Sequence, residues 1–170
     1  TQDPRFTIVD AVYYHHFEPD EEFSNLFLSE LTEHEYYYEG GNFIANSQNE
    51  CLIVNKTATQ RIPDSVFLNH YGCKVLTRLP HVKGIGHADE SVKFVDDQTV
   101  LTDEPSYIPL LEEKGYTVVQ LPRPNNEYET YVNSLIINGK VFVPIFKQDK
   151  DQEVLKIYED LGYEAFGYDS

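Results

Sequence analysis

Short apolar runs alternate with polar turns along most of the chain, and the order of these runs recurs. From Gly41 the chain reads as a strand-like NFIAN, a polar SQNE, a strand CLIVN, a helical stretch ending at HYG and a strand KVLTRLP. The same order of strand, turn, strand, helix and strand begins again near Ser91 and near Tyr131. Alternation of short strands with helical segments predicts an α/β fold built from ββαβ units.

The ends of the predicted elements carry residues that suit turns and helix termini. Asn138-Gly139 separates two apolar runs, and both residues tolerate the positive φ of a tight hairpin. Asn49-Glu50 and Asp96-Asp97 are weaker versions of this turn. A glycine follows each helical stretch, where a left-handed terminal residue is best without a Cβ. These glycines are Gly72, Gly115 and Gly162, which are about 43 and 47 residues apart.

The recurring units predict one domain over residues 1–170. They cover about residues 41–80, 91–122 and 131–168, after a lead segment of residues 1–40. In the third helical stretch one face is apolar at helical spacing, as expected for a helix that covers a sheet. The apolar residues of this face are Val154, Leu155, Tyr158 and Leu161. Units of this length favour radial or solenoidal stacking. The alternative is a single α+β sheet with hairpins that resemble one another by coincidence.

Charge narrows the choice of partners. The chain has 13 Lys and Arg against 29 Asp and Glu, so its formal net charge is −16. This sign argues against nucleic acid, whose phosphates need basic surfaces. No apolar run approaches the roughly 18 residues of a membrane span, so we expect no membrane partner. Long-range attraction instead favours small cationic ligands.

Two cysteines and six histidines are the candidate redox and metal residues. Cys51 and Cys73 both lie in apolar, strand-like contexts, which favours two buried thiols over a single disulfide. No pair of histidines has a recognised metal-ligand spacing, so no metal site and no cofactor are expected. The acidic stretch from Asp96 to Glu104 is a candidate for calcium, but it lacks the alternation of a calcium loop and favours a solvated face.

Three loops with unusual chemistry precede the first strands of the three units. They are Glu39-Gly40-Gly41-Asn42, the stretch Gly84–Glu90 and the stretch Pro122–Glu127. Two glycines after Glu39 permit close approach of backbone and ligand. If the backbone is extended, His87 and Asp89 point to the same side, where they suit acid–base work on a cationic group. Each loop taken alone also reads as an ordinary turn, surface pair or rigid connection. Their corresponding positions predict that all three meet in one pocket.

The motifs YEGGNF, GHADESVKFV and YVNSLIINGKVFVPIF, in this order, resemble those of the guanidine-modifying superfamily with the pentein fold. They are most like those of agmatine deiminases and bacterial-type peptidyl-arginine deiminases. The opening TQDP is similar to the end of that family's Trp-x-x-Asp motif, without the Trp. The resemblance covers nearly the whole chain. It implies a five-bladed propeller of ββαβ units, of which this chain holds about three, around an axial active site.

The resemblance also implies a reaction and roles for five residues. The reaction is hydrolysis of a guanidinium, in a small substrate or an arginine side chain, to a ureido group and ammonia. Asp3 and Asp89 match the carboxylates that grip the guanidinium, and His87 matches the general acid and base. Glu39 matches the acidic residue that supports the histidine and the substrate, and Asn42 is expected near the substrate.

One part of the family pattern is missing. The family's nucleophilic cysteine follows a histidine in a Gly-rich segment, and neither Cys51 nor Cys73 occupies such a position. A missing C-terminal segment or a second chain is therefore expected to supply the thiolate of a covalent amidino-cysteine intermediate. Two alternatives stay open. One is a non-catalytic binding module with a pentein-like fold, since fold does not settle function. The other is an amidinotransferase, which passes the amidino group to an amine.

Overall fold

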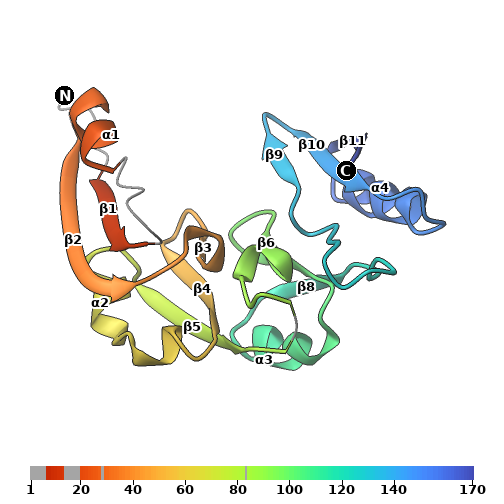
Figure 1. The fold of residues 1–170 in the computed structure, drawn as a ribbon. Coiled ribbons are helices and arrows are strands. Elements are labelled where there is room, and N and C mark those ends of the chain that lie inside the picture. Colours follow the sequence, from red (N-terminus) through yellow and green to blue (C-terminus); the bar gives the residue numbers. More distant parts are fainter. Residues whose placement is uncertain (1–6, 14–19, 28, 83) are drawn as a thin grey trace.

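The computed structural model describes residues 7–13, 20–27, 29–82 and 84–170, and its strands pair into four separate sheets (Figure 1). The strands are β1 Thr7–Val12, β2 Glu30–Tyr37, β3 Ile44–Ala45, β4 Glu50–Asn55, β5 Val75–Pro80, β6 Val92–Phe94, β7 Thr99–Thr102, β8 Thr117–Gln120, β9 Leu135–Ile137, β10 Lys140–Ile145 and β11 Glu164–Asp169. The α-helices are α1 Asp20–Phe27, α2 Asp64–Asn69, α3 Ile108–Glu113 and α4 Asp151–Asp160. Short 3₁₀ turns are η1 Gly40–Asn42, η2 Thr59–Arg61, η3 Ala88–Glu90 and η4 Pro105–Tyr107.

Three of the sheets share one plan. In the orders β3-β4-β5, β6-β7-β8 and β9-β10-β11, the first two strands are antiparallel and the third runs parallel to the second. A helix connects the second strand to the third in each case. A parallel pair needs such a crossover, whereas an antiparallel pair needs only a tight turn. The predicted ββαβ order is therefore confirmed, and the alternative of a single α+β sheet is wrong.

The turns and helix ends follow the predicted chemistry. Asn138 and Gly139 have φ values of 50° and 75° in the β9–β10 hairpin, as a tight turn with two positive φ values requires. Gly72, Gly115 and Gly162 follow α2, α3 and α4 with φ values of 72°, 93° and 93°. These glycines therefore end the helices in the left-handed region, where a Cβ would be strained.

The lead segment contains a fourth unit that the sequence pattern did not indicate. Strands β1 and β2 pair in parallel, with Thr7 opposite Glu30, and α1 connects them. The strand β2 reads ELTEHEYY, in which charged residues interrupt the apolar alternation, so its sequence gives little strand signal.

The apolar core lies between successive sheets rather than inside any one of them. One cluster joins Tyr38 of the first unit to Ile53 on β4 and Phe67 on α2. A second cluster joins Leu52 and Val54, on the opposite face of β4, to Val100 on β7 and Leu111 on α3. A third cluster joins Leu101 on β7 to Val141 on β10 and Val154 on α4. Each of the first three sheets thus packs its face remote from its own helix against the helix-bearing side of the next unit. The four units follow one another along an arc (Figure 1).

The preference for two buried thiols is wrong. Cys51 on β4 and Cys73, just before β5, are 1% and 4% exposed, as expected, but they form a disulfide. Parallel pairing of β4 with β5 brings their Cα atoms to 5.8 Å, which is within the range that a disulfide bridges. Cys51 is opposite Leu76 in the ladder, and Cys73 comes close to it just before β5 because the chain crosses over through α2. The 22-residue separation of the two cysteines does not reveal this.

The described strands form no closed ring, so the five-bladed propeller remains a prediction. Within the described residues, no helix is both long and apolar enough to cross a membrane.

Candidate active site

Two of the three predicted loops meet. Glu39 follows β2 and immediately precedes the turn η1, while His87 immediately precedes the turn η3. The His87 imidazole Nε2 lies 2.7 Å from the Glu39 Oε2 atom, although the residues are 48 positions apart. A second contact fixes the loop of His87, because its backbone N–H donates to Glu90 Oε2 at 3.2 Å.

Gly41 lies directly against two of the predicted site residues, His87 and Asp89. A Cβ built on Gly41 would be 2.7 Å from His87 Nδ1, and 3.0 Å from one carboxylate oxygen of Asp89. Only a residue without a side chain permits this approach. His87 and Asp89 therefore face the same backbone segment. The reason differs from the one expected, because residues Ala88–Glu90 form a 3₁₀ turn and only His87 is extended, with φ −94° and ψ 145°.

The carboxylate of Glu39 is held at both oxygens. The Tyr37 hydroxyl donates to Oε1 at 2.6 Å, while Oε2 accepts from the Lys56 ammonium and faces His87. Burial alone would raise the pKa of Glu39, but the hydrogen bonds from Lys56, Tyr37 and His87 outweigh it and lower this pKa to about 2. Glu39 is therefore ionised over the whole range in which proteins are normally studied.

This arrangement assigns the two nitrogens of His87. An ionised carboxylate only accepts hydrogen bonds, so the Glu39 contact assigns a proton to Nε2. The other nitrogen, Nδ1, is the one that faces Gly41 and the side of Asp89. In the neutral ring Nδ1 can accept a proton, and in the imidazolium it can donate one. Nδ1 is thus the atom through which His87 can exchange protons with a group bound beside Asp89.

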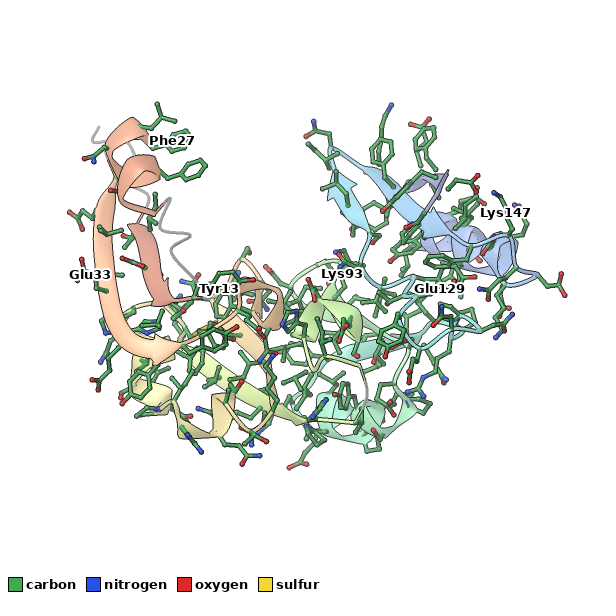
Figure 2. All side chains as sticks on the ribbon, viewed as in Figure 1. Tyr13, Phe27, Glu33, Lys93, Glu129 and Lys147 are labelled. Atoms are coloured by element: carbon green, nitrogen blue, oxygen red, sulfur yellow. A yellow bond between two sulfur atoms is a disulfide. The ribbon has the colours of Figure 1, made fainter. Side chains whose placement is uncertain are left out.

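Asp89 differs from Glu39 in its environment. Burial raises the pKa of Asp89, and the Glu90 charge adds to this, while His87 and Lys93 counteract it. Burial in turn lowers the pKa of Lys93 on β6, with Asp89 opposing that shift. Lys93 lies near the middle of the arc (Figure 2). Among the described residues, Asp89 has no ion pair at hydrogen-bonding distance, and it is half-buried. Such a carboxylate gains from an incoming cation, because part of the surrounding water is already excluded.

The depressed pKa of Glu39 predicts how stability depends on pH. Its folded value of about 2 lies below the ordinary value of 4.5, so ionised Glu39 stabilises the fold above pH 4.5. This contribution is lost as the pH falls from 4.5 through about 2. We expect Glu39→Gln to flatten the acid side of the stability profile in this window. Urea unfolding followed by circular dichroism at several pH values measures it.

The matched control for this experiment is Glu112→Gln, which changes an exposed glutamate on α3. This variant should keep the slope of the wild type. Asp89 contributes in the opposite sense, because its raised pKa favours the folded state at low pH and this advantage fades as the pH rises. An unchanged slope in Glu39→Gln would contradict the assigned ion pair.

Asn42 is fully buried, and its side chain makes three hydrogen bonds within the fold. Its Nδ2 donates to the Val54 carbonyl at 2.9 Å and to the Thr59 hydroxyl at 3.1 Å, and its Oδ1 accepts from the Val54 N–H at 2.7 Å. These bonds attach the turn η1, and with it Gly41, to the end of β4. Its predicted place near the substrate stays a prediction.

The third loop does not join this cluster. Arg123 donates to the Asp103 carbonyl at 2.7 Å and pairs with Glu104, while the backbone of Asn125 contacts Gln148. The loop therefore serves the junction between the third and fourth units. The end of the loop does reach the second loop, because Glu127 lines a small pocket together with Gly84 and Glu90. Thr130, just beyond it, donates a 2.9 Å hydrogen bond to the Glu90 carbonyl. Asp3, the second predicted guanidinium-gripping residue, lies outside the described residues.

In the described part of the chain, no three His, Cys, Asp or Glu residues gather as metal ligands. The expected absence of a metal or cofactor stays a prediction. The acidic stretch is engaged otherwise. Asp96 accepts from the backbone N–H groups of Gln98 and Thr99, and Asp97 accepts from Ser47. Calcium binding there stays a prediction.

Three residues of the site were missed by the sequence reasoning. Tyr37 stands two positions before Glu39, a spacing that places both side chains on one side of an extended segment and could have indicated the contact. Lys56, directly after β4, and Lys93, on β6, carry no local signal. The packing of β4 and β6 beside the two loops brings them to the carboxylates.

Comparison with known families and structures gives consistent matches. The family model for Porphyromonas-type peptidyl-arginine deiminase matches residues 11–164. The agmatine deiminase of C. jejuni matches with a TM-score of 0.77 and 20% identity, over 98% of this chain and 62% of that one. A putative arginine deiminase from Porphyromonas gingivalis matches with a TM-score of 0.72 and 21% identity, over 96% of this chain and 64% of that one. The DDAH of Pseudomonas aeruginosa, complexed with citrulline, matches with a TM-score of 0.62 and 13% identity, over 89% of this chain and 57% of that one.

These likenesses establish the fold, and the chain spans less than two thirds of the length of each of the three solved structures. A search of curated protein sequences gave no match.

Proposed function

The chain belongs to the Porphyromonas-type peptidyl-arginine deiminase family, and we propose on this basis that it provides the binding and acid–base part of a hydrolase of guanidino groups. The substrate would be an arginine-type guanidinium, in a small molecule such as agmatine or in a peptidyl arginine. The products would be the ureido compound and ammonia. The observation that carries the proposal is the approach of His87 and Asp89 to Gly41, with His87 oriented by Glu39.

The proposed site suits a guanidinium for physical reasons. A guanidinium is planar and permanently charged, and its N–H groups match the two oxygens of a carboxylate. Asp89 presents a half-buried carboxylate, and the partial exclusion of water strengthens such a bond. Asp3 would be the second carboxylate by family resemblance. The net charge of −16 adds long-range attraction for any cationic substrate.

The chemistry would proceed in two steps. A thiolate attacks the guanidinium carbon and forms a C–S bond, and ammonia departs with a proton from the His87 imidazolium. The neutral ring then takes a proton from water, which attacks the amidino carbon. The C–S bond breaks, and the ureido product and the thiolate are released. His87 Nδ1 is the proposed site of both proton transfers, because Nε2 is committed to Glu39.

The nucleophile would come from outside these 170 residues. The chain has two cysteines, and both are joined in the disulfide between Cys51 and Cys73. Neither is available as a thiolate, which is the nucleophilic form. We propose that a further segment of the protein or a second chain contributes the reactive cysteine.

The arc of four units supports the proposed propeller architecture. Each of the first three units has its open sheet face covered by the next unit, but the open face of β9-β10-β11 is exposed. Its exposed apolar side chains are Leu135, Ile137, Phe166 and Tyr168. At the other end of the arc, α1 exposes Phe23, Leu26 and Phe27, the last of which is labelled in Figure 2. A fifth ββαβ unit between these surfaces would cover both and complete the ring.

The test is guanidinium binding to this chain, because binding needs no nucleophile. We expect calorimetry to show agmatine binding to the wild type and a loss of about tenfold to 100-fold in Asp89→Asn, since a charge-assisted pair contributes roughly 1.5–3 kcal/mol. The control Asp149→Asn removes an exposed carboxylate and should bind as the wild type does.

Two results would contradict the proposal. Equal affinity of the wild type and Asp89→Asn would remove Asp89 from the site. Failure of agmatine, arginine and a blocked arginine peptide to bind at all would favour the pentein-like binding module. An amidinotransferase would bind the same guanidinium, and product analysis of the complete enzyme with an amine acceptor distinguishes it.

A further inference from the structure

Lys56 connects three segments of the proposed site. It directly follows β4, and its ammonium bonds to Glu39 Oε2 and to the Ile85 carbonyl, the latter at 3.3 Å. Its side chain is 18% exposed. The end of β4, the Glu39 turn and the loop that leads to His87 therefore share one cation.

Close packing along the lysine stem keeps this geometry. A Cβ built on Gly86 would be 2.9 Å from the His81 ring and 3.3 Å from Lys56 Cδ, so a side chain at residue 86 would require these neighbours to shift. Gly86 also has a φ of 77°, which a larger residue would adopt only with strain. The ammonium thus sits at the end of a stem that its neighbours confine.

The contacts of Glu39 give the two carboxylates of the site, Glu39 and Asp89, different roles. Tyr37 and Lys56 anchor Glu39, and the oxygen bound by Lys56 is also the oxygen that faces His87. The lysine therefore compensates the charge of Glu39. Asp89 has no such ion pair at hydrogen-bonding distance in the described part of the chain. An incoming guanidinium is then attracted to Asp89, while Glu39 stays bound to the histidine.

We propose that Lys56 is a positioning residue, which holds the Glu39 carboxylate against His87 Nε2 and so reserves Nδ1 for proton transfer and Asp89 for the guanidinium. This inference rests on the proposed function for its catalytic meaning. Its structural content, the dependence of Glu39 on Lys56, is measurable without substrate.

The first experiment follows the carboxyl carbon of Glu39 by NMR as the pH is changed. In the wild type we expect the titration midpoint near the pKa of about 2. In Lys56→Met the midpoint should rise by about one pH unit or more, because a neighbouring cation lowers a carboxyl pKa by about that amount. Lys56→Gln, which keeps a hydrogen-bond donor without the charge, should rise as well. Lys56→Arg should return the midpoint toward the wild-type value.

The control is Lys74→Met, which removes an exposed lysine and should leave the Glu39 midpoint unchanged. A merely structural lysine would lower stability in Lys56→Met without moving the midpoint. An unmoved midpoint in both Lys56→Met and Lys56→Gln would overturn the proposal. If Lys56→Met fails to fold, the comparison of Lys56→Gln with Lys56→Arg decides.

Agmatine affinity separates this inference from the proposed function. We expect Lys56→Met to bind agmatine within about threefold of the wild type, because Asp89 holds the guanidinium. A tenfold loss of affinity would overturn the proposal, because Lys56 would then be needed for the guanidinium site at Asp89 and not for Glu39 alone. If no variant binds agmatine but the Glu39 midpoint still rises in Lys56→Met, the proposed function fails and the positioning by Lys56 stands.

Discussion

Gly41→Ala is expected to weaken agmatine binding at least tenfold, and to lower turnover of the complete enzyme about 100-fold. The added Cβ would lie 2.7 Å from His87 Nδ1 and 3.0 Å from an Asp89 oxygen, which is closer than non-bonded atoms allow. The two side chains must then separate from the turn η1. Displacing catalytic groups by less than about 1 Å is enough for a loss of this size. Calorimetry with agmatine measures the effect on the chain itself.

Gly40→Ala is the matched control for this substitution. Gly40 is the preceding residue, and a Cβ on it would meet nothing within 4 Å. Both glycines have φ values outside the left-handed region, so neither substitution strains the backbone in that way. Gly40→Ala should bind as the wild type does. If both variants bind equally well, the close approach of Gly41 to His87 and Asp89 does not matter for the site.

Asn42→Ala is expected to destabilise the fold by about 3 kcal/mol, the largest stability effect that we predict. The substitution removes three hydrogen bonds made by a side chain that is fully buried. It also leaves the N–H and carbonyl of Val54 buried without these partners, and an unsatisfied buried group costs about 1–3 kcal/mol. Urea unfolding at neutral pH measures the loss.

Asn133→Ala serves as the control, because Asn133 is exposed. It should change the free energy of unfolding by less than about 0.5 kcal/mol. A loss below 1 kcal/mol in Asn42→Ala would mean that the turn η1 does not depend on its attachment to β4. Because η1 carries Gly41, Asn42→Ala should also weaken agmatine binding in the fraction that stays folded.

The sequence predicted the elements that obey simple local rules. Asn138, Gly139 and the helix-ending Gly162 adopt positive φ values. Glycine has no Cβ to clash in this region and asparagine tolerates it, so the residue type alone predicts these turns. The apolar face of α4 was also predictable, since Val154 and Tyr158 are fully buried at helical spacing. The first unit was not, because the strand β2 has charged residues in its alternation.

Contacts between distant segments were harder to foresee. The motif resemblance indicated Glu39, His87 and Asp89, and the structure joins them through the turns η1 and η3. It gave no indication of Lys56, which acts on Glu39 from the end of β4. The Cys51–Cys73 disulfide was disfavoured for the same reason, because strand pairing decides which residues meet. The loop at Arg123 had the right position in its unit but contacts Glu104 instead.

The most direct test of the proposed site is an NMR titration of the 15N-labelled chain with agmatine at about 0.15 M salt. At this ionic strength the attraction of the acidic surface is largely screened beyond about 8 Å, so a specific site is distinguished from diffuse binding. We predict saturable shifts centred on Gly41, His87 and Asp89. Shifts spread over the acidic surface without saturation, or confined to residues away from η1 and η3, would contradict a guanidinium site at this position.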